Sequence, residues 1–157
     1  MISLDADVIR QFVGRAAREK LASIKVFDEI DSTNSYLMQI PGPIPGQMGI
    51  AVTSNQTAGR GRFGKRWQSP PGSGLCLSAA YTFSSQPDNL PALTLALGLS
   101  VVYALEEVGA SNVELKWPND LVALDGKLGG ILTEVQNQSG STVTVITGVG
   151  EIGRAHV

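Results

Sequence analysis

The sequence predicts an α+β fold in which packed helices cover a mainly antiparallel mixed sheet. Two observations indicate this class: short alternating segments separated by turn residues, which are typical of strands joined as hairpins, and a few segments with helical spacing. The chain has 157 residues, of which 43% are hydrophobic and 17% charged, and this is enough apolar material for one domain with its own core. It shows no internal repeat, low-complexity tract or interdomain linker.

Two short helices are expected in the first quarter of the chain. Residues 5–13 place apolar side chains at helical spacing. Ser32 is a good N-cap for a second helix that runs to about Ile40, because its hydroxyl can accept a hydrogen bond from the first turn. Residues 41–46 are rich in proline and glycine and are expected to form a loop.

A longer helix is expected in the middle of the chain. It begins near Asp88 or Asn89, has Pro91 in its first turn and ends at Gly109. The apolar stretch 90–105 is too short to span a bilayer, so it predicts a buried helix and no membrane segment.

Several segments have the alternation or the short apolar runs of strands, namely residues 24–28, 49–53, 75–83, 113–117, 121–124, 127–135 and 142–147. Asp125 and Gly126 separate two of them, and this dipeptide predicts a type I′ hairpin turn, which needs positive φ angles. Pro118 breaks the chain between two others.

Charge and cysteine content narrow the function classes. The net charge is −2 and the pI is about 5.3, so bulk charge gives no reason to expect a nucleic-acid or acidic-membrane partner. The single cysteine, Cys76, lies in a predicted strand, where a small buried side chain is expected rather than a nucleophile. One cysteine allows no internal disulfide, and the acidic N-terminus lacks an apolar run; both fit a cytoplasmic protein.

Residues 55–74, termed here the glycine-rich loop, hold the most informative charge cluster. Four of the 12 lysines and arginines fall within residues 60–66. Nearby glycines let backbone N–H groups approach an anion, and arginine matches the oxygens of carboxylates and phosphates. Trp67 offers a flat face to a purine, or packs in the core. The loop therefore predicts a site for a small anionic ligand.

Four other interpretations of this loop are possible. Gly59, Gly61 and Gly64 match G-x-G-x-x-G and, with Lys65, nearly match a P-loop, but both motifs need a helix that residues 67–72 cannot begin. A solvated surface loop remains open on the residues alone. So does an Arg/Gly arm that makes the chain a nucleic-acid-binding module.

Four segments, in order, resemble motifs of the biotin–protein ligases. They are Asp-Ser-Thr-Asn at 31–34, the loop at 56–67, Lys-Trp-Pro-Asn-Asp at 116–120 and Lys-Leu-Gly-Gly-Ile-Leu at 127–132. The resemblance runs from about residue 24 to residue 150. It implies a fold akin to class II aminoacyl-tRNA synthetases and a two-step reaction. Biotin and ATP give biotinyl-AMP, with Mg²⁺, and a lysine of a biotin carboxyl carrier protein then takes the biotin.

The resemblance assigns residues to biotin and to catalysis. The biotin-binding set is Ser32, Thr33, Asn34, Gln56, Gly59, Arg60, Lys127, Gly129 and Gly130. Ser32 also caps a helix, and glycines in a strand otherwise indicate a bulge. Lys127 and Arg60 are the expected catalytic groups, because a cation between the biotin carboxylate and the α-phosphate offsets the repulsion of two anions.

A second set is assigned to ATP: Arg62, Lys65, Trp67, Lys116, Asn119 and Asp120. Asp120 is also the expected Mg²⁺ ligand. A lipoate or octanoate protein ligase or transferase of related fold is the alternative within the same chemistry.

The end of the chain departs from the family pattern. Members usually have Gly-x-Gly-x-Asn after the last strand, whereas here Gly148 and Gly150 are followed by Glu151 and Ile152 without that asparagine. Residues 1–150 are therefore interpreted as an incomplete catalytic domain, and 151–157 as a non-native tail. Reduced activity is expected of the chain as it stands. No DNA-binding domain is recognised ahead of the core.

Overall fold

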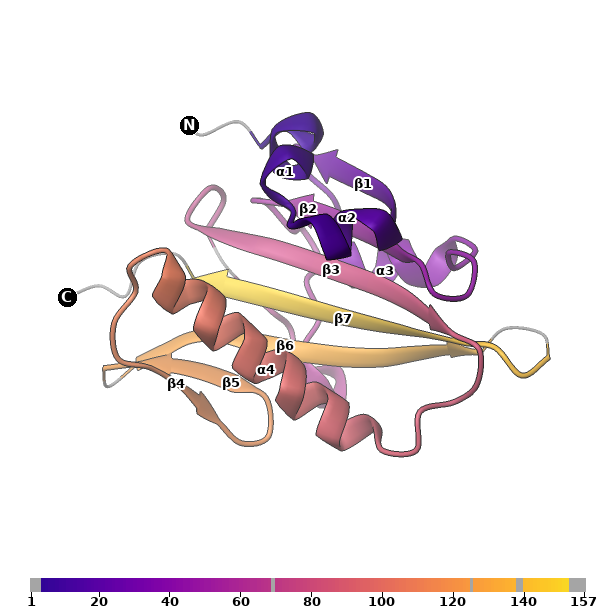
Figure 1. The fold of residues 1–157 in the computed structure, drawn as a ribbon. Coiled ribbons are helices and arrows are strands. Elements are labelled where there is room, and N and C mark those ends of the chain that lie inside the picture. Colours follow the sequence, from indigo (N-terminus) through magenta and orange to yellow (C-terminus); the bar gives the residue numbers. More distant parts are fainter. Residues whose placement is uncertain (1–3, 69, 125, 138–139, 153–157) are drawn as a thin grey trace.

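A computed structural model describes residues 4–68, 70–124, 126–137 and 140–152. Within them, seven strands form one sheet in the order β1-β2-β3-β7-β6-β5-β4 (Figure 1). The strands are β1 (Leu21–Phe27), β2 (Met48–Thr53), β3 (Gly74–Phe83), β4 (Val113–Lys116), β5 (Asp120–Ala123), β6 (Gly126–Asn137) and β7 (Val143–Ile152). The helices are α1 (Ala6–Phe12), α2 (Arg15–Lys20), α3 (Thr33–Gln39) and α4 (Leu90–Glu107), with a 3₁₀ turn, η1 (Arg62–Gly64).

The strand pairing confirms the predicted mainly antiparallel mixed sheet. Only β1 and β2 pair in parallel, and the other neighbours in the described sheet run antiparallel. Helix α2 was not predicted, because residues 15–20 carry four charged side chains and no apolar stripe. Its side chains are exposed, and Arg15 pairs with Glu19 one turn later at 3.3 Å.

The two faces of the sheet carry separate cores. Helix α3 packs on β2, β3 and β7 around Leu37, Ala51, Ala80 and Ile146. Helix α4 covers the other face, over β4, β5 and β6, around Val102, Val113, Leu121 and Ile131. The faces are opposite because Ile131 and Glu134 of β6 are three residues apart, and Glu134 pairs directly with Ile146.

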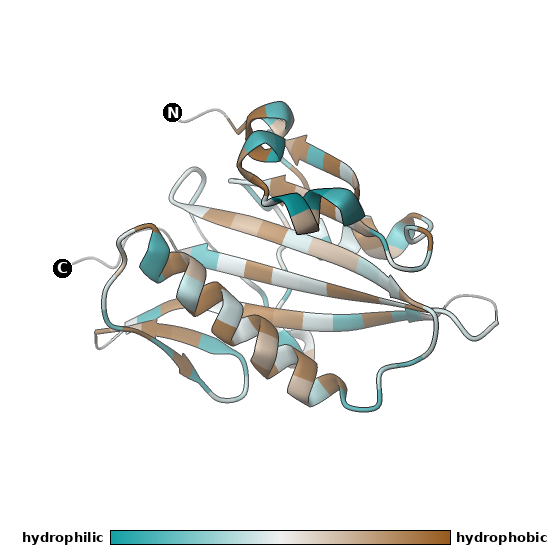
Figure 2. Ribbon diagram, viewed as in Figure 1, coloured by the Kyte–Doolittle hydropathy of each residue, from teal (hydrophilic) through white to brown (hydrophobic). Residues whose placement is uncertain are grey.

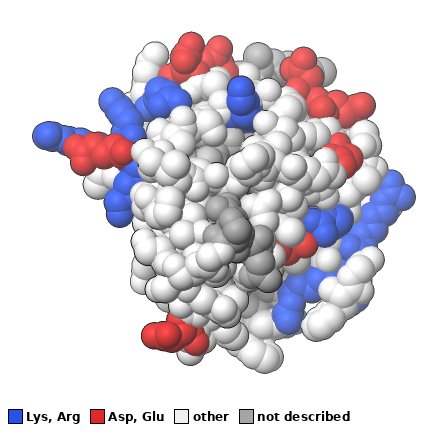
Figure 3. Space-filling view, turned by 90° about the vertical axis from the view of Figure 1, so that its right-hand side faces the viewer, with Lys and Arg blue, Asp and Glu red and all other residues white. Residues whose placement is uncertain are grey.

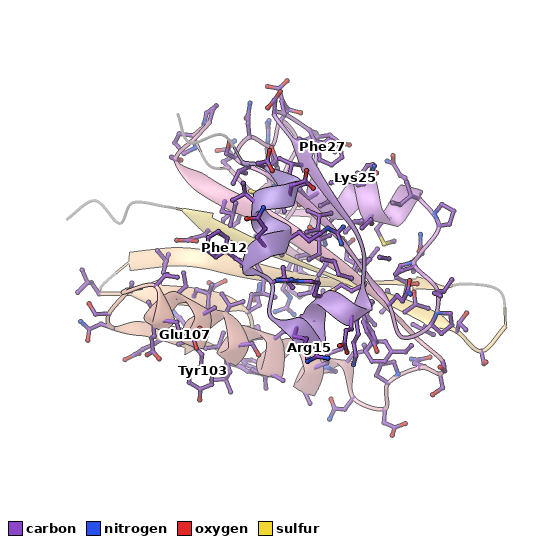
Figure 4. All side chains as sticks on the ribbon, turned by 45° about the horizontal axis from the view of Figure 1, so that its top comes forward. Phe12, Arg15, Lys25, Phe27, Tyr103 and Glu107 are labelled. Atoms are coloured by element: carbon purple, nitrogen blue, oxygen red, sulfur yellow. The ribbon has the colours of Figure 1, made fainter. Side chains whose placement is uncertain are left out.

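Helix α4 begins where the sequence predicts, but it is less buried than expected. Asn89 accepts a hydrogen bond from the N–H of Ala92 at 3.0 Å. Only Gly98 and Val102 of the helix are buried, whereas Tyr103 is 61% exposed on the side away from the sheet (Figure 4). The prediction of a buried helix is therefore wrong for the outer half, because no layer of the described chain covers it.

The apolar stretch 90–105 was predicted to be too short to span a bilayer, but α4 is longer, and its length and composition alone would let it cross a membrane. It is the one such helix in the described part of the chain. Its apolar residues are spread around the helix, as the brown bands in Figure 2 show. Here it packs against the sheet through Val102 and its neighbours.

The β5–β6 hairpin forms where it was predicted, with an irregular register. Leu121 pairs with Gly129 and Val122 pairs with Lys127, so Leu128 is an extra residue and forms a β-bulge. Asp125 lies outside the described residues, so the predicted type I′ turn is not described. The preceding residue, Leu124, has a positive φ of 54°.

Removing the fully buried Leu121 side chain beyond Cβ should destabilise the fold. Leu121→Ala is expected to lower the free energy of unfolding by about 2–5 kcal/mol, because a cavity is left between α4 and the sheet. Urea denaturation followed by circular dichroism measures this. Ile44→Ala, at a side chain that is 66% exposed, is the control and should change it by less than about 0.5 kcal/mol. Equal effects of the two substitutions would contradict the core described here.

Candidate active site

One cavity of about 270 Å³ brings the four predicted segments together. It lies on the α3 side of the sheet, beside the N-terminus of that helix and under the glycine-rich loop. Most of the predicted site residues line it: Ser32, Thr33, Asn34, Gln56, Arg60, Arg62, Lys65, Trp67, Asn119, Asp120, Lys127 and Gly130.

Three predicted site residues do not line this cavity. A Cβ at Gly59 would lie 2.8 Å from both Gln56 Nε2 and the carbonyl oxygen of Trp67, so this glycine is needed for packing within the loop. A Cβ at Gly129 would lie 2.7 Å from the carbonyl oxygen of Gly150 on the neighbouring strand. Lys116 is exposed on β4. Ligand contacts by these three residues stay predictions.

A buried polar network forms the closed end of the cavity. Ser32 caps α3 as predicted, accepting a hydrogen bond from the N–H of Ser35 at 3.3 Å. The N–H of Thr33 donates to Gln56 Oε1 at 2.8 Å. Ser78 Oγ lies 2.7 Å from Thr33 Oγ1 and 2.6 Å from Asn34 Oδ1.

Sequence reasoning missed Ser78, which is fully buried on β3. The alternation along 75–83 drew attention to its larger apolar residues, yet these are only partly buried. The buried face of β3 carries small side chains: Cys76, Ser78, Ala80 and Thr82. Small residues at every second position of a strand were the available sign that another element approaches closely there.

Glycines of β7 make room for two of the predicted site residues. A Cβ at Gly148 would overlap Asn34 Oδ1, and a Cβ at Gly150 would lie 2.6 Å from Trp67 Cε2. This close approach explains why glycines occur in a strand that sequence reasoning ended at residue 147. Glu151 and Ile152 continue β7, while the domain boundary drawn at residue 150 remains a prediction.

Cationic side chains converge on the open end of the cavity, and several are already held in place. Arg60 pairs with Glu134, Arg62 Nη1 donates to Asn119 Oδ1 at 3.1 Å, and Lys127 Nζ donates to Asp120 Oδ1 at 2.8 Å. Because these contacts come from β5, β6 and the turn between β4 and β5, the protein itself holds the positive groups in position.

Figure 3 shows charged side chains around the margin of one side of the molecule and a wide uncharged area between them. The chain as a whole is acidic, so the cations that gather in one concave site indicate binding of a small anion rather than a general attraction of the surface for anions.

Trp67 forms a wall of the cavity. Its ring packs against Gly130 and Gly150, and Lys127 Nζ lies 5.6 Å from the ring centroid. The indole Nε1 is buried and has no hydrogen-bond partner among the described residues. Trp67 is half-buried and lines the cavity, while its predicted contact with a nucleotide stays a prediction.

A second cavity of about 310 Å³ shares Arg62, Asn119 and Ile131 with the first. It extends beside Trp117 toward the first turn of α4. Its lining is more apolar than that of the first cavity, since Leu90, Pro91, Leu95, Trp117, Pro118, Ile131 and Val135 contribute to it.

Asp120 is the carboxylate that lines the first cavity. Nowhere in the described chain do three or more His, Cys, Asp or Glu side chains gather as a metal-binding cluster. Nucleotide-bound Mg²⁺ needs few protein ligands, because phosphates and water complete its octahedron. Asp120 therefore fits the part of a single carboxylate ligand, although its Oδ1 here accepts from Lys127.

Comparison with known proteins identifies the family. Residues 26–151 match the Biotin/lipoate A/B protein ligase family. The chain belongs to this family. It is 40% identical over 129 residues to the Bifunctional ligase/repressor BirA of Salmonella typhimurium, a match that covers 82% of this chain and 40% of that protein. The resemblance drawn from the four segments is thereby confirmed.

Solved structures of family members share the fold. The biotin protein ligase from Leishmania major in complex with biotinyl-5-AMP matches with a TM-score of 0.68 and 27% identity, over 83% of this chain and 57% of that one. The biotin protein ligase from Aquifex aeolicus in complex with biotin and ATP matches with a TM-score of 0.66 and 33% identity, over 87% and 55%. The chain thus spans little more than half the length of these family members.

Removal of the Ser78 hydroxyl should weaken this family member's fold. Ser78→Ala leaves Asn34 Oδ1 and Thr33 Oγ1 without that buried contact, and is expected to lower the free energy of unfolding by about 1–3 kcal/mol. Chemical denaturation measures the change. Ser100→Ala, at an exposed position on α4, should change it by less than about 0.5 kcal/mol. A Ser78 variant as stable as the parent would show that the network is not tightly formed.

Proposed function

We propose that this chain is the biotin-activating part of a biotin–protein ligase. It binds biotin and ATP, forms biotinyl-5′-AMP and passes biotin to a lysine of a carboxylase carrier domain. The observation that carries the proposal is a single cavity with a buried, uncharged polar end and a cationic open end. That asymmetry matches biotin, which has a polar uncharged ring system at one end and a carboxylate at the other.

The closed end suits a ureido ring. Such a ring presents N–H donors and a carbonyl acceptor, and Thr33, Asn34, Gln56 and Ser78 offer hydroxyl and amide groups to meet them. These groups already bond to one another, but their remaining donor and acceptor positions can be used by a ureido ring and not by an apolar ring. A site built to hydrogen-bond its substrate rejects an analogue that lacks the matching groups, and this favours biotin over lipoate.

The nucleotide is assigned to the neighbouring cavity. Arg62 and Asn119 line both cavities, so a triphosphate held by Arg62 would bring its α-phosphate toward the carboxylate end of the first. The apolar surface beside Trp117 would then take the base and ribose. Mg²⁺ would neutralise phosphate charge, with Asp120 as its protein ligand.

Lys127 and Arg60 supply the cations for the reaction itself. An oxygen of the biotin carboxylate attacks the α-phosphorus, the bond to the bridging oxygen breaks, and pyrophosphate leaves. Two anions must meet in this step, so positive charge placed between them lowers the barrier. No general base is needed, because the carboxylate is ionised at neutral pH. In the second step the carrier lysine attacks the carbonyl carbon, and AMP leaves.

Biotin-dependent exchange of labelled pyrophosphate into ATP tests this proposal. Calorimetric titration of the chain with biotin comes first, since the closed end lies within the chain, and exchange is measured next. We expect binding and exchange with biotin, and neither with lipoate. Binding and exchange with lipoate but not with biotin would instead indicate a lipoate–protein ligase. Salt-dependent binding of DNA or RNA without biotin binding would favour the nucleic-acid alternative.

Lys127→Ala should separate chemistry from binding. The substitution is expected to slow adenylate formation by about a hundredfold, because a cation aimed at developing charge contributes on the order of 3 kcal/mol. Biotin affinity should change much less, since the closed end is untouched. Single-turnover formation of biotinyl-AMP and calorimetry measure the two. Lys25→Ala on β1, a residue outside the cavity that is labelled in Figure 4, is the control. Adenylate formed at the parent rate would exclude Lys127 from the step.

A further inference from the structure

Glu134 is a charged residue that the sequence analysis did not assign to the site. It lies on β6, on the α3 side of the sheet, behind the residues that line the cavity. Its carboxylate accepts three hydrogen bonds: Oε1 from Arg60 Nη1 at 2.9 Å, Oε2 from Arg60 Nη2 at 2.6 Å, and Oε2 from Asn34 Nδ2 at 2.9 Å. One acid thus holds two residues of the ligand site that belong to different segments of the chain.

The contacts of Glu134 complete a closed circuit around the cavity. From Asn34 the hydrogen bonds continue through Ser78 to Thr33, and from Thr33 to Gln56. Gln56 and Arg60 are four residues apart in the glycine-rich loop, so this chain of hydrogen bonds begins and ends in the same loop. The closed end and the cationic end of the cavity are therefore fixed by the same set of bonds.

The geometry of the pair leaves Arg60 able to bind a second anion. Glu134 takes one N–H from each of Nη1 and Nη2. A guanidinium has five N–H donors, so Nε and the outward N–H bonds remain for a ligand. The Arg60 side chain is 41% exposed and that of Glu134 only 23%. Without its partner, a half-exposed arginine would sample many rotamers, and ligand binding would have to select one of them.

We propose that Glu134 is a positioning residue that orients Arg60 for the carboxylate of the substrate and links it to Asn34 at the closed end. This role rests on the proposed function. Glu134 does not touch the substrate itself. It acts by fixing the guanidinium in the orientation that the carboxylate meets, and by tying that orientation to the hydrogen bonds of the closed end.

The test compares two ligands that differ in the group Arg60 would meet. Biotin carries a carboxylate, and biotinamide has an uncharged amide in its place. Glu134→Gln keeps the size of the side chain but removes its charge and one acceptor oxygen. Calorimetry should show about tenfold weaker binding of biotin by E134Q and less than twofold change for biotinamide. In an Arg60→Ala background, E134Q should add no further loss for biotin.

Glu114→Gln on β4, an exposed glutamate outside the cavity, is the matched control and should bind both ligands as the parent does. Biotinamide binding also shows whether E134Q has folded. An equal loss for both ligands would mean that Glu134 only supports the fold, and unchanged biotin binding would mean that it positions nothing; either overturns the proposal. A parent chain that binds neither ligand would instead refute the proposed function, and this role with it.

Discussion

The close approach of side chains to the backbone of β7 is the constraint on which the rest of the site depends. Gly148 and Gly150 have no Cβ, and in the freed space lie Asn34 from α3 and Trp67 from the glycine-rich loop. Because β7 pairs with β3 on one side and β6 on the other, both elements are placed against the middle of the sheet. Any larger residue at these positions would push the helix or the loop away, and with it the wall of the cavity.

A second requirement follows from the depth of the closed end. Hydroxyl and amide groups are buried there, and each such group is costly unless it is hydrogen-bonded. Ser78, Thr33, Asn34 and Gln56 hydrogen-bond one another. Such a network is rigid and oriented in advance, which is what a site needs if it is to select one ring by its hydrogen bonds.

Helix capping and the alternation of apolar residues along the sequence predicted most of the helices and strands. The cap at Ser32, the start of α4 near Asn89 and the alternation of the strands lie where the sequence placed them. Helix α2 escaped prediction because it has no apolar stripe. The exposure of α4 could not be predicted either, since the composition of a helix does not reveal whether one or two of its sides are covered. Most assigned site residues met in one cavity, but they were found through motif resemblance. Ser78 and Glu134 lie outside the motifs and become visible only when distant strands are brought together.

The bulge at Leu128 decides on which side of the sheet a charge is presented. In a regular strand, residues 127 and 130 would point to opposite faces, because side chains alternate. The extra residue reverses this parity, so that Lys127 faces the cavity together with Gly130 while Ile131 still faces α4. The bulge, and not the chemistry of the lysine, therefore decides which face of the sheet carries the ammonium group. If residues 127–130 formed a regular strand without the bulge, every motif letter would be unchanged, yet that cation would turn toward the apolar layer beneath α4.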